Sequence, residues 1–432
     1  MDESIISDTA LPQVQVELPE ALREPTRSKN LLFMVLFTVA SMVIGVSNIA
    51  IVPILLPEQI AILMRGNQAS IFSLILGLSS LVGVLTNPVV GMFSDRTTSR
   101  LGRRRPWYIV GGVFTVIDIF LMAHAPSLLA VALEWIVLQV PINMLNVTLS
   151  AIIPDQVPLR QRATFSALAG GPGVLLGGLF GQILVAQFFK GISAAYTSLA
   201  ITIAIMVALF LLVLREVPLS KEHVPQMRAR YALAMLKPLA SRDFALVWVS
   251  RCLMYLGYTT VVNFMFFFLQ DAVHYTGVFP GQTTAQGVST LFGVSVVTII
   301  IASLVGGIIS DRLLRRKLFV IVASLIMMVG LLLYAFFPVW SIVLVGTTVV
   351  GIGFGIYLAA DFALASQVLP AALDRGKDIG IIQAAIYVPM ILSPIIAGIT
   401  LSVWHSFLPL YVLLAVGALV SAILIVLVKG VR

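Results

Sequence analysis

The sequence holds little charge. Asp, Glu, Lys and Arg make up only 11% of its 432 residues, whereas hydrophobic residues make up 59%. An ordinary soluble domain is about a quarter charged and about half apolar. A water-soluble fold of this size could not cover so much apolar surface. The composition therefore excludes the ordinary soluble classes and predicts a chain that folds within a lipid bilayer.

Several chemical signatures are also missing. Cys252 is the only cysteine, which excludes an intrachain disulfide and a cysteine-based metal cluster, so we interpret it as an inert buried thiol. The four histidines are scattered, and no Gly-x-x-x-x-Gly-Lys-Ser/Thr loop occurs. We therefore expect no metal, no cofactor and no direct use of ATP. No catalytic constellation is visible, so we expect no enzyme, and the polar first thirty residues lack the apolar segment of a cleavable signal peptide.

Apolar runs dominate the rest of the chain. A run of about 20 apolar residues crosses a bilayer as a helix, because hydrocarbon offers backbone groups no other partners. Such runs predict twelve membrane-spanning helices, at 31–57, 70–94, 107–125, 128–153, 163–189, 194–214, 243–269, 287–310, 318–337, 340–365, 379–403 and 407–428.

The basic residues orient these spans. With the N-terminus in the cytoplasm, 24 of the 27 Lys and Arg residues fall in cytoplasmic segments, the exceptions being Arg65, Lys190 and Arg251. Cytoplasmic loops are the ones enriched in Lys and Arg, so both termini are predicted to be cytoplasmic. The same distribution accounts for the net charge of +8 without a nucleic-acid partner.

The chain also repeats itself. Gly91-Met92-Phe93-Ser94-Asp95-Arg96 is matched by Gly307-Ile308-Ile309-Ser310-Asp311-Arg312, half the chain further on. Two halves of one topology are typical of parallel-repeat transporters, with a site between the halves near the membrane midplane. We therefore expect six-helix bundles at 29–214 and 243–428, a disordered cytoplasmic tail at 1–28, a cytoplasmic linker at 215–242 and a tail at 429–432. The linker segment 224–239 is either a short helix on the membrane surface or a plain connection.

These motifs resemble the major facilitator superfamily, whose loop after the second helix carries Gly, Asp-Arg and a basic cluster. Here that signature is Gly91, Asp95 and Arg96, followed by Arg100, Gly102 and Arg103-Arg104-Arg105. Its form, with the stretch from Tyr357 to Gly380, resembles the glycoside–pentoside–hexuronide and sucrose-type cation symporters and their bacterial relatives. The resemblance implies an all-α fold of two pseudo-symmetric six-helix bundles, cation-coupled sugar transport and the bacterial inner membrane. Plant sucrose carriers place an aspartate and an arginine around their fourth helix, where this sequence has Gln139 and Ser150.

The repeated motif predicts a gate at the cytoplasmic side, formed by Gly91, Asp95, Arg96, Gly307, Asp311 and Arg312. A carboxylate is stabilised at a helix N-terminus by the helix dipole. The resemblance implies that Asp95 meets the start of the eleventh helix near Ile379 and Gly380. Pseudo-symmetry then places Asp311 near Ala163 and Thr164. We interpret Arg103, Arg104 and Arg105 only as topology determinants.

Glycines at 173, 177 and 181 recur every four residues and predict a small-residue seam against a helix of the other half, either sliding or static.

Charges at membrane depth are costly and are therefore functional candidates. There are four: Asp118, Glu134, Arg251 and Asp361. Matching depths predict a pair between Arg251 and Asp361, either a fixed brace or a proton-coupling site. Asp118 either faces lipid in its protonated form or turns toward a neighbouring helix, and Glu134 either reaches extracellular water or faces the cavity.

Polar side chains crowd the expected cavity helices, and we predict that they bind the substrate. They are Asn48, Gln139, Asn143, Asn146, Tyr255, Tyr258, Asn263 and Tyr357. Amides and hydroxylated rings suit a polyhydroxylated ligand, although such groups also join helices. Trp135 is either a stacking platform or an interface anchor.

The sequence therefore predicts a monomeric carrier that moves a small-molecule substrate across the lipid bilayer, with a sugar or glycoside as substrate and a proton as coupling ion. A drug or metabolite exporter of the same fold is the alternative, favoured by the run Phe264-Met265-Phe266-Phe267-Phe268, which we expect to face lipid in part. A non-transporting scaffold fits the gate motifs less well, and the absence of a pore-lining ring or filter argues against a channel.

Overall fold

The computed structural model describes residues 25–26, 28–168, 173–189, 191–219, 241–313, 316–367 and 375–429. These residues are almost entirely helical. Eleven of their helices are long and apolar enough to cross a membrane. The twelfth predicted span, 163–189, is described as separate helical pieces on either side of residues 169–172, which lie outside the described part.

The first bundle contains the elements before the linker. They are α1 (Leu31–Gly45), η2 (Val46–Leu55), α2 (Leu56–Leu63), α3 (Gln68–Asp95), α4 (Arg105–Met122), α5 (Leu128–Gln156), α6 (Leu159–Leu168), α7 (Val174–Ile183), η4 (Leu184–Phe188) and α8 (Ile192–Val213). Segments α1, η2 and α2 form one continuous span, in which η2 is π-helical.

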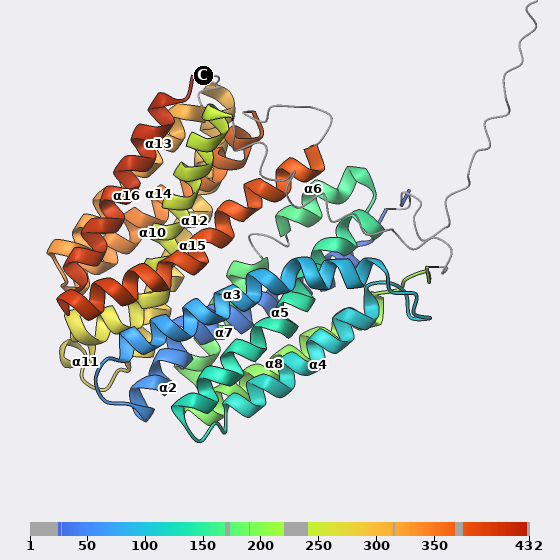
Figure 1. The fold of residues 1–432 in the computed structure, drawn as a ribbon, viewed down its shortest axis with the longest axis horizontal. Helices are drawn as coiled ribbons and strands as arrows, with labels where there is room; N and C mark the ends of the chain where they lie inside the picture. The colour runs from blue at the N-terminus through green and yellow to red at the C-terminus, as the bar shows by residue number, and fades with distance from the viewer. Residues whose placement is uncertain are drawn as a thin grey trace, which may run out of the picture.

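The second bundle follows the linker. Its elements are α10 (Arg242–Phe267), η7 (Phe268–Ala272), α11 (Tyr275–Val278), α12 (Thr284–Leu313), α13 (Arg316–Phe336), α14 (Trp340–Gln367), α15 (Arg375–Trp404) and α16 (Phe407–Leu427). Figure 1 shows the blue-to-green and yellow-to-red helices as two separate groups.

Local sequence explains where several helices begin. The side chains of Asn30, Ser127 and Ser406 each accept a hydrogen bond from a backbone N–H in the first turn of α1, α5 and α16, respectively. Such caps satisfy donors that have no partner inside the helix.

The two halves repeat in space as well as in sequence. A Cβ on Gly91 would lie 3.8 Å from Val147 of α5, and a Cβ on Gly307 would lie 3.8 Å from Ala359 of α14. Each glycine of the repeated motif therefore faces the equivalent neighbour in its own bundle.

The two bundles meet at the end that holds the 64–67 and 273–283 connections, called here the outer end after the orientation predicted from charge. Phe72 of α3 makes edge-on ring contacts with Phe264 and Phe267 of α10. Gln270 Nε2 donates to Gln68 Oε1 at 3.2 Å. Toward the inner end, where α6 lies and α15 begins, the two groups of helices diverge (Figure 1).

Helices α3 and α15 form the main seam between the bundles. The Ser80 hydroxyl donates to the carbonyl of Met390 at 3.1 Å. Nearer the outer end, a Cβ on Gly398 would lie 2.8 Å from Ser73 Cβ, so only glycine allows this close approach.

Two expectations about packing were wrong. Gly173, Gly177 and Gly181 lie against Ser41, Met42 and Ala50 of their own bundle, not against the other half, because α7 packs along α1 and η2. The run from Phe264 to Phe268 is buried throughout and does not face lipid, since its rings pack against α3, α13 and α16.

Some expectations fall outside the described residues. They include most of the 1–28 tail, the linker segment 224–239 and the tail residues 430–432.

Candidate functional site

An ion pair lies inside the second bundle. Arg251 of α10 and Asp361 of α14 meet with Nη1 2.5 Å from Oδ2, and their side chains are only 4% and 5% exposed. The Tyr357 hydroxyl donates to the other carboxylate oxygen of Asp361 at 2.5 Å. The Nε of Arg251 donates to no partner in the described part of the chain. The structure thus confirms the ion pair that was predicted from the matching depths of Arg251 and Asp361 in the membrane. It also adds Tyr357 as a hydrogen-bond donor to Asp361.

Aromatic rings cover this ion pair. The guanidinium carbon of Arg251 lies 5.5 Å from the centre of the Tyr255 ring. Tyr258 stacks on Phe354 with ring centres 4.0 Å apart, and Tyr255 meets the same Phe354 edge-on. Three predicted substrate residues, Tyr255, Tyr258 and Tyr357, therefore form one cluster with Phe354, which sequence reasoning missed because an apolar ring carries no signal.

The predicted amide face on α5 is partly occupied by its own helix. Gln139 Nε2 donates to the Trp135 carbonyl at 3.4 Å, and Asn143 Nδ2 donates to the Gln139 carbonyl at 2.7 Å. Asn48 does the same toward Ile44. Asn146 of α5 and Asn263 of α10 are half-buried.

The two acidic candidates of the first bundle differ in exposure. Asp118 is buried and Glu134 is half-buried. Asp118 Oδ2 has no hydrogen-bond partner in the described residues. Trp135 is buried and donates to Ser79 at 3.0 Å, so it joins α5 to α3 instead of anchoring at an interface.

A small pocket with a cavity volume of about 30 Å³ lies between the bundles. Pro53 and Gln182 line it from the first bundle, and Tyr258 and Ser295 from the second. Sequence reasoning missed Gln182, because it follows the glycines at 173, 177 and 181 directly and that whole segment was interpreted as a packing surface. The available signal was the pair of amides, Gln182 and Gln187, in a mostly apolar span.

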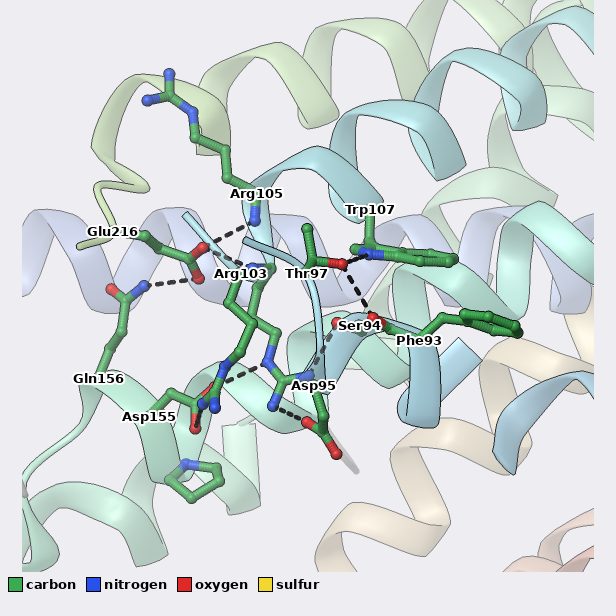
Figure 2. Close-up of polar contacts among 12 residues, drawn as sticks. Phe93, Ser94, Asp95, Thr97, Arg103, Arg105, Trp107, Asp155, Gln156 and Glu216 are labelled. Atoms are coloured by element: carbon green, nitrogen blue, oxygen red, sulfur yellow. Dashed lines mark hydrogen bonds and ion pairs between the residues drawn. The ribbon is translucent and has the colours of Figure 1, made fainter. Parts of the chain in front are cut away.

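A second charged site lies at the inner end of the first bundle (Figure 2). Arg104 is buried, with its guanidinium 2.5 Å from Asp95, 2.8 Å from Asp155 and 2.8 Å from Ser94. Arg103 also pairs with Asp155, at 2.6 Å. The interpretation of these arginines as topology determinants alone was therefore wrong, because Arg104 folds back between α3 and α5.

Electrostatics keep Arg104 charged. Burial opposes the charge, but the carboxylates of Asp155 and Asp95 overcome this effect and raise the pKa of Arg104 above its ordinary value. The arginine consequently acts as a permanent cross-link between the ends of two helices.

Glu216, just after α8, fixes the loop that carries Arg104. One of its carboxylate oxygens accepts from the backbone N–H of Arg104 at 2.6 Å and of Arg105 at 3.0 Å, at the start of α4. A carboxylate at a helix N-terminus is favoured by the free N–H groups and by the dipole. Gly102 has φ +100°, and a Cβ there would lie 2.3 Å from Glu216 Cβ, so glycine is required by conformation and by space.

The predicted gate is described only in part. Asp95 is about half exposed and pairs with Arg104 in its own bundle, and Arg96 ends α3. Arg312 lies in the last turn of α12. The predicted contacts near Ile379 and Gly380, and those of Asp311 with Ala163, involve side chains outside the described part.

Known proteins resemble this chain in sequence and in fold. The model of the Major Facilitator Superfamily matches residues 33–285 and 281–432. The general alpha-glucoside permease of Schizosaccharomyces pombe is 23% identical over 209 residues, which is 44% of this chain and 37% of the permease. The human proton-associated sugar transporter A is 26% identical over 187 residues, which is 37% of this chain and 24% of that protein. The chain thus matches well under half the length of either relative.

Two solved structures share the fold. One is a mutant of the nucleoside transporter NupG, with a TM-score of 0.73, 15% identity and coverage of 91% of this chain and 99% of the other. The other is a bacterial homologue of the human lysosomal transporter Spinster, in an inward-facing and unoccupied conformation, with a TM-score of 0.67, 12% identity and coverage of 92% and 94%. With the family match over nearly the whole chain, two helical bundles and an internal repeat, this integral membrane protein belongs to the major facilitator superfamily.

Proposed function

We propose that this protein is a secondary active transporter that moves a sugar or glycoside together with a proton by alternating access. The observation that carries the proposal is the Arg251–Asp361–Tyr357 cluster. An ion pair only 4% and 5% exposed inside one bundle is costly to maintain, and intramembrane ionisable pairs commonly serve proton coupling. The names of two relatives, an alpha-glucoside permease and a proton-associated sugar transporter, support the substrate class.

In the mechanism that follows, Asp361 gains a proton and thereby weakens its hold on Arg251. The freed guanidinium is next to Tyr255, and Tyr357 can follow the carboxyl, so the local charge balance changes at the face of α10 and α14. Substrate and proton together then allow the bundles to rock. In this proposal both termini lie in the cytoplasm, the membrane is the bacterial inner membrane, and the inner-end residues Asp95 and Asp311 latch the opposite state.

The outer-end contacts support the alternating-access part. Phe72 against Phe264 and Gln270 to Gln68 join the bundles at one end, while the helices diverge at the other. An arrangement of this kind is what the proposal expects of the inward-facing member of a rocking pair.

Uptake into proteoliposomes tests the proposal. Radiolabelled maltose should accumulate when the outside is more acidic than the lumen, and accumulation should collapse when an ionophore removes the proton gradient. Accumulation that is indifferent to the ionophore would contradict proton coupling.

A drug or metabolite exporter is the second candidate, because mostly apolar side chains line the pocket between the bundles. Extrusion of a hydrophobic dye, with no maltose uptake under any gradient, would favour it.

A further inference from the structure

One buried amide in the first bundle is hydrogen-bonded at only one of its two ends. Pro53 has no N–H and lies in η2, whose π-helical backbone departs from the regular α-helical bonding pattern. Gln182 of α7 donates from Nε2 to the Ile49 oxygen in this segment, at 2.7 Å. Because Gln182 is completely buried, this bond fixes the plane of its amide.

The other end of the same amide is unused. Gln182 Oε1 is buried and has no hydrogen-bond partner in the described part of the chain. A buried acceptor without a partner is costly, because it has lost water and gained nothing in return. An amide oxygen only accepts, so the missing partner must carry an O–H or N–H donor.

This residue lines the pocket between the bundles. Most of the lining is apolar, contributed by residues such as Val261, Met265 and Phe292. Among the polar lining groups, Tyr334 and Thr347 bond each other at 2.8 Å. An apolar pocket with a few fixed polar groups is the usual design of a small-molecule site, in which the polar groups set specificity.

We propose that Gln182 is a specificity-determining residue, whose side-chain oxygen accepts a hydrogen bond from a hydroxyl or N–H group of the transported solute. The bond to Ile49 holds the amide nitrogen, so the oxygen is the free acceptor of this pocket-lining residue. The proposal rests on the proposed function and adds to it a requirement for a donor on the solute. A site built to bond a donor rejects an analogue that lacks it, since the oxygen is then left unpaired.

The chain offers a matched control. Gln59 of α2 is also buried, donates through Nε2 to the carbonyl of Met122 at 3.0 Å and leaves its Oε1 unpartnered in the described residues. It does not line the pocket. Gln59→Met thus removes the same chemistry from a place without a ligand.

The test measures binding of maltose, methyl α-D-glucoside and uridine to the purified full-length protein by ligand-induced shifts in melting temperature. Gln182→Met should weaken binding roughly tenfold, as expected for loss of one buried hydrogen bond, while Gln59→Met should bind as the wild type does.

Two results would overturn the proposal. They are wild-type affinity in Gln182→Met, or no binding of any of the three probes to the wild type. Binding of uridine alone, dependent on Gln182, would support the residue assignment while removing sugars as the substrate class. Binding that depends on Gln182 without proton-driven accumulation would contradict the proposed proton coupling and leave the assignment of Gln182 intact.

Discussion

Replacing Asp361 by Asn should destabilise the protein severely. The substitution keeps the size of the side chain but leaves Arg251, which is 4% exposed, without its counter-ion. Removing one partner of a buried ion pair costs about 3–5 kcal/mol, because the remaining charge is uncompensated. The hydroxyl of Tyr357, 2.5 Å from the carboxylate, would also have to bond an amide in its place.

A double variant without either charge separates the contribution of the Arg251–Asp361 pair to stability from its proposed role in proton coupling. Arg251→Met/Asp361→Leu removes both charges and fills the space with apolar atoms, so its stability should lie within about 1–2 kcal/mol of the wild type. If the pair couples the proton, both variants lose uphill accumulation of maltose in proteoliposomes but keep exchange down a gradient. If the pair were only a brace, the double variant would still accumulate maltose.

The assay is unfolding in detergent, followed by transport on the variants that fold. Asp271→Asn is the matched control, since Asp271 is an exposed residue at the outer end of the span that carries Arg251 and should change stability by less than about 0.5 kcal/mol. Equal stability of Asp361→Asn and Asp271→Asn would refute the reasoning about the buried charge.

Three further predictions concern the inner end of the first bundle. Arg104→Gln should lower the free energy of unfolding by about 2–3 kcal/mol through loss of its bonds to Asp155, Ser94 and Asp95, whereas Arg100→Gln, at an exposed position in the same loop, should change it little in the same melts. The pKa of Arg104 is raised, so its contribution to stability is complete below the ordinary pKa of arginine and is lost only above it. The difference in free energy of unfolding between wild type and Arg104→Gln that arises from this titration should therefore stay constant from about pH 6 to about pH 9. A fall in that difference across this range would contradict the assignment. Gly102→Ala should cost more than Gly191→Ala, because both glycines have positive φ, about 1–3 kcal/mol of strain for alanine, but only Gly102 also meets Glu216; equal losses in melting temperature would refute the clash.

Hydropathy and depth were enough to predict the spans and one ion pair. The helix bounds follow from the length of apolar runs, and Arg251 and Asp361 were paired because each lies at a similar depth on helices expected to line one cavity. Those arguments need only rise per residue and the cost of charge in lipid.

The directions in which side chains and helix faces point were harder to predict. The three adjacent arginines at 103–105 are the same residue type. Arg104 nevertheless bonds both α3 and α5, whereas Arg103 pairs with α5, because Gly102 and Glu216 set the loop conformation. The glycine stripe on α7 was assigned to the wrong neighbour for a similar reason: spacing shows that a narrow face exists, not which helix approaches it. Gln182 bonds the carbonyl of Ile49, and nothing in the linear order connects the first span to an amide 133 residues later.

A reversible disulfide across the outer seam tests rocking of the two bundles most directly. The Cβ positions of residues 73 and 398 are close enough that Ser73→Cys/Gly398→Cys can form a disulfide after a shift of about 1 Å. With Cys252→Ser in all variants, oxidation should abolish maltose uptake and reductant should restore it to the level of the reduced double variant. Ser73→Cys alone should transport equally in both conditions. Complete cross-linking with unchanged uptake would contradict alternating access through separation of α3 from α15.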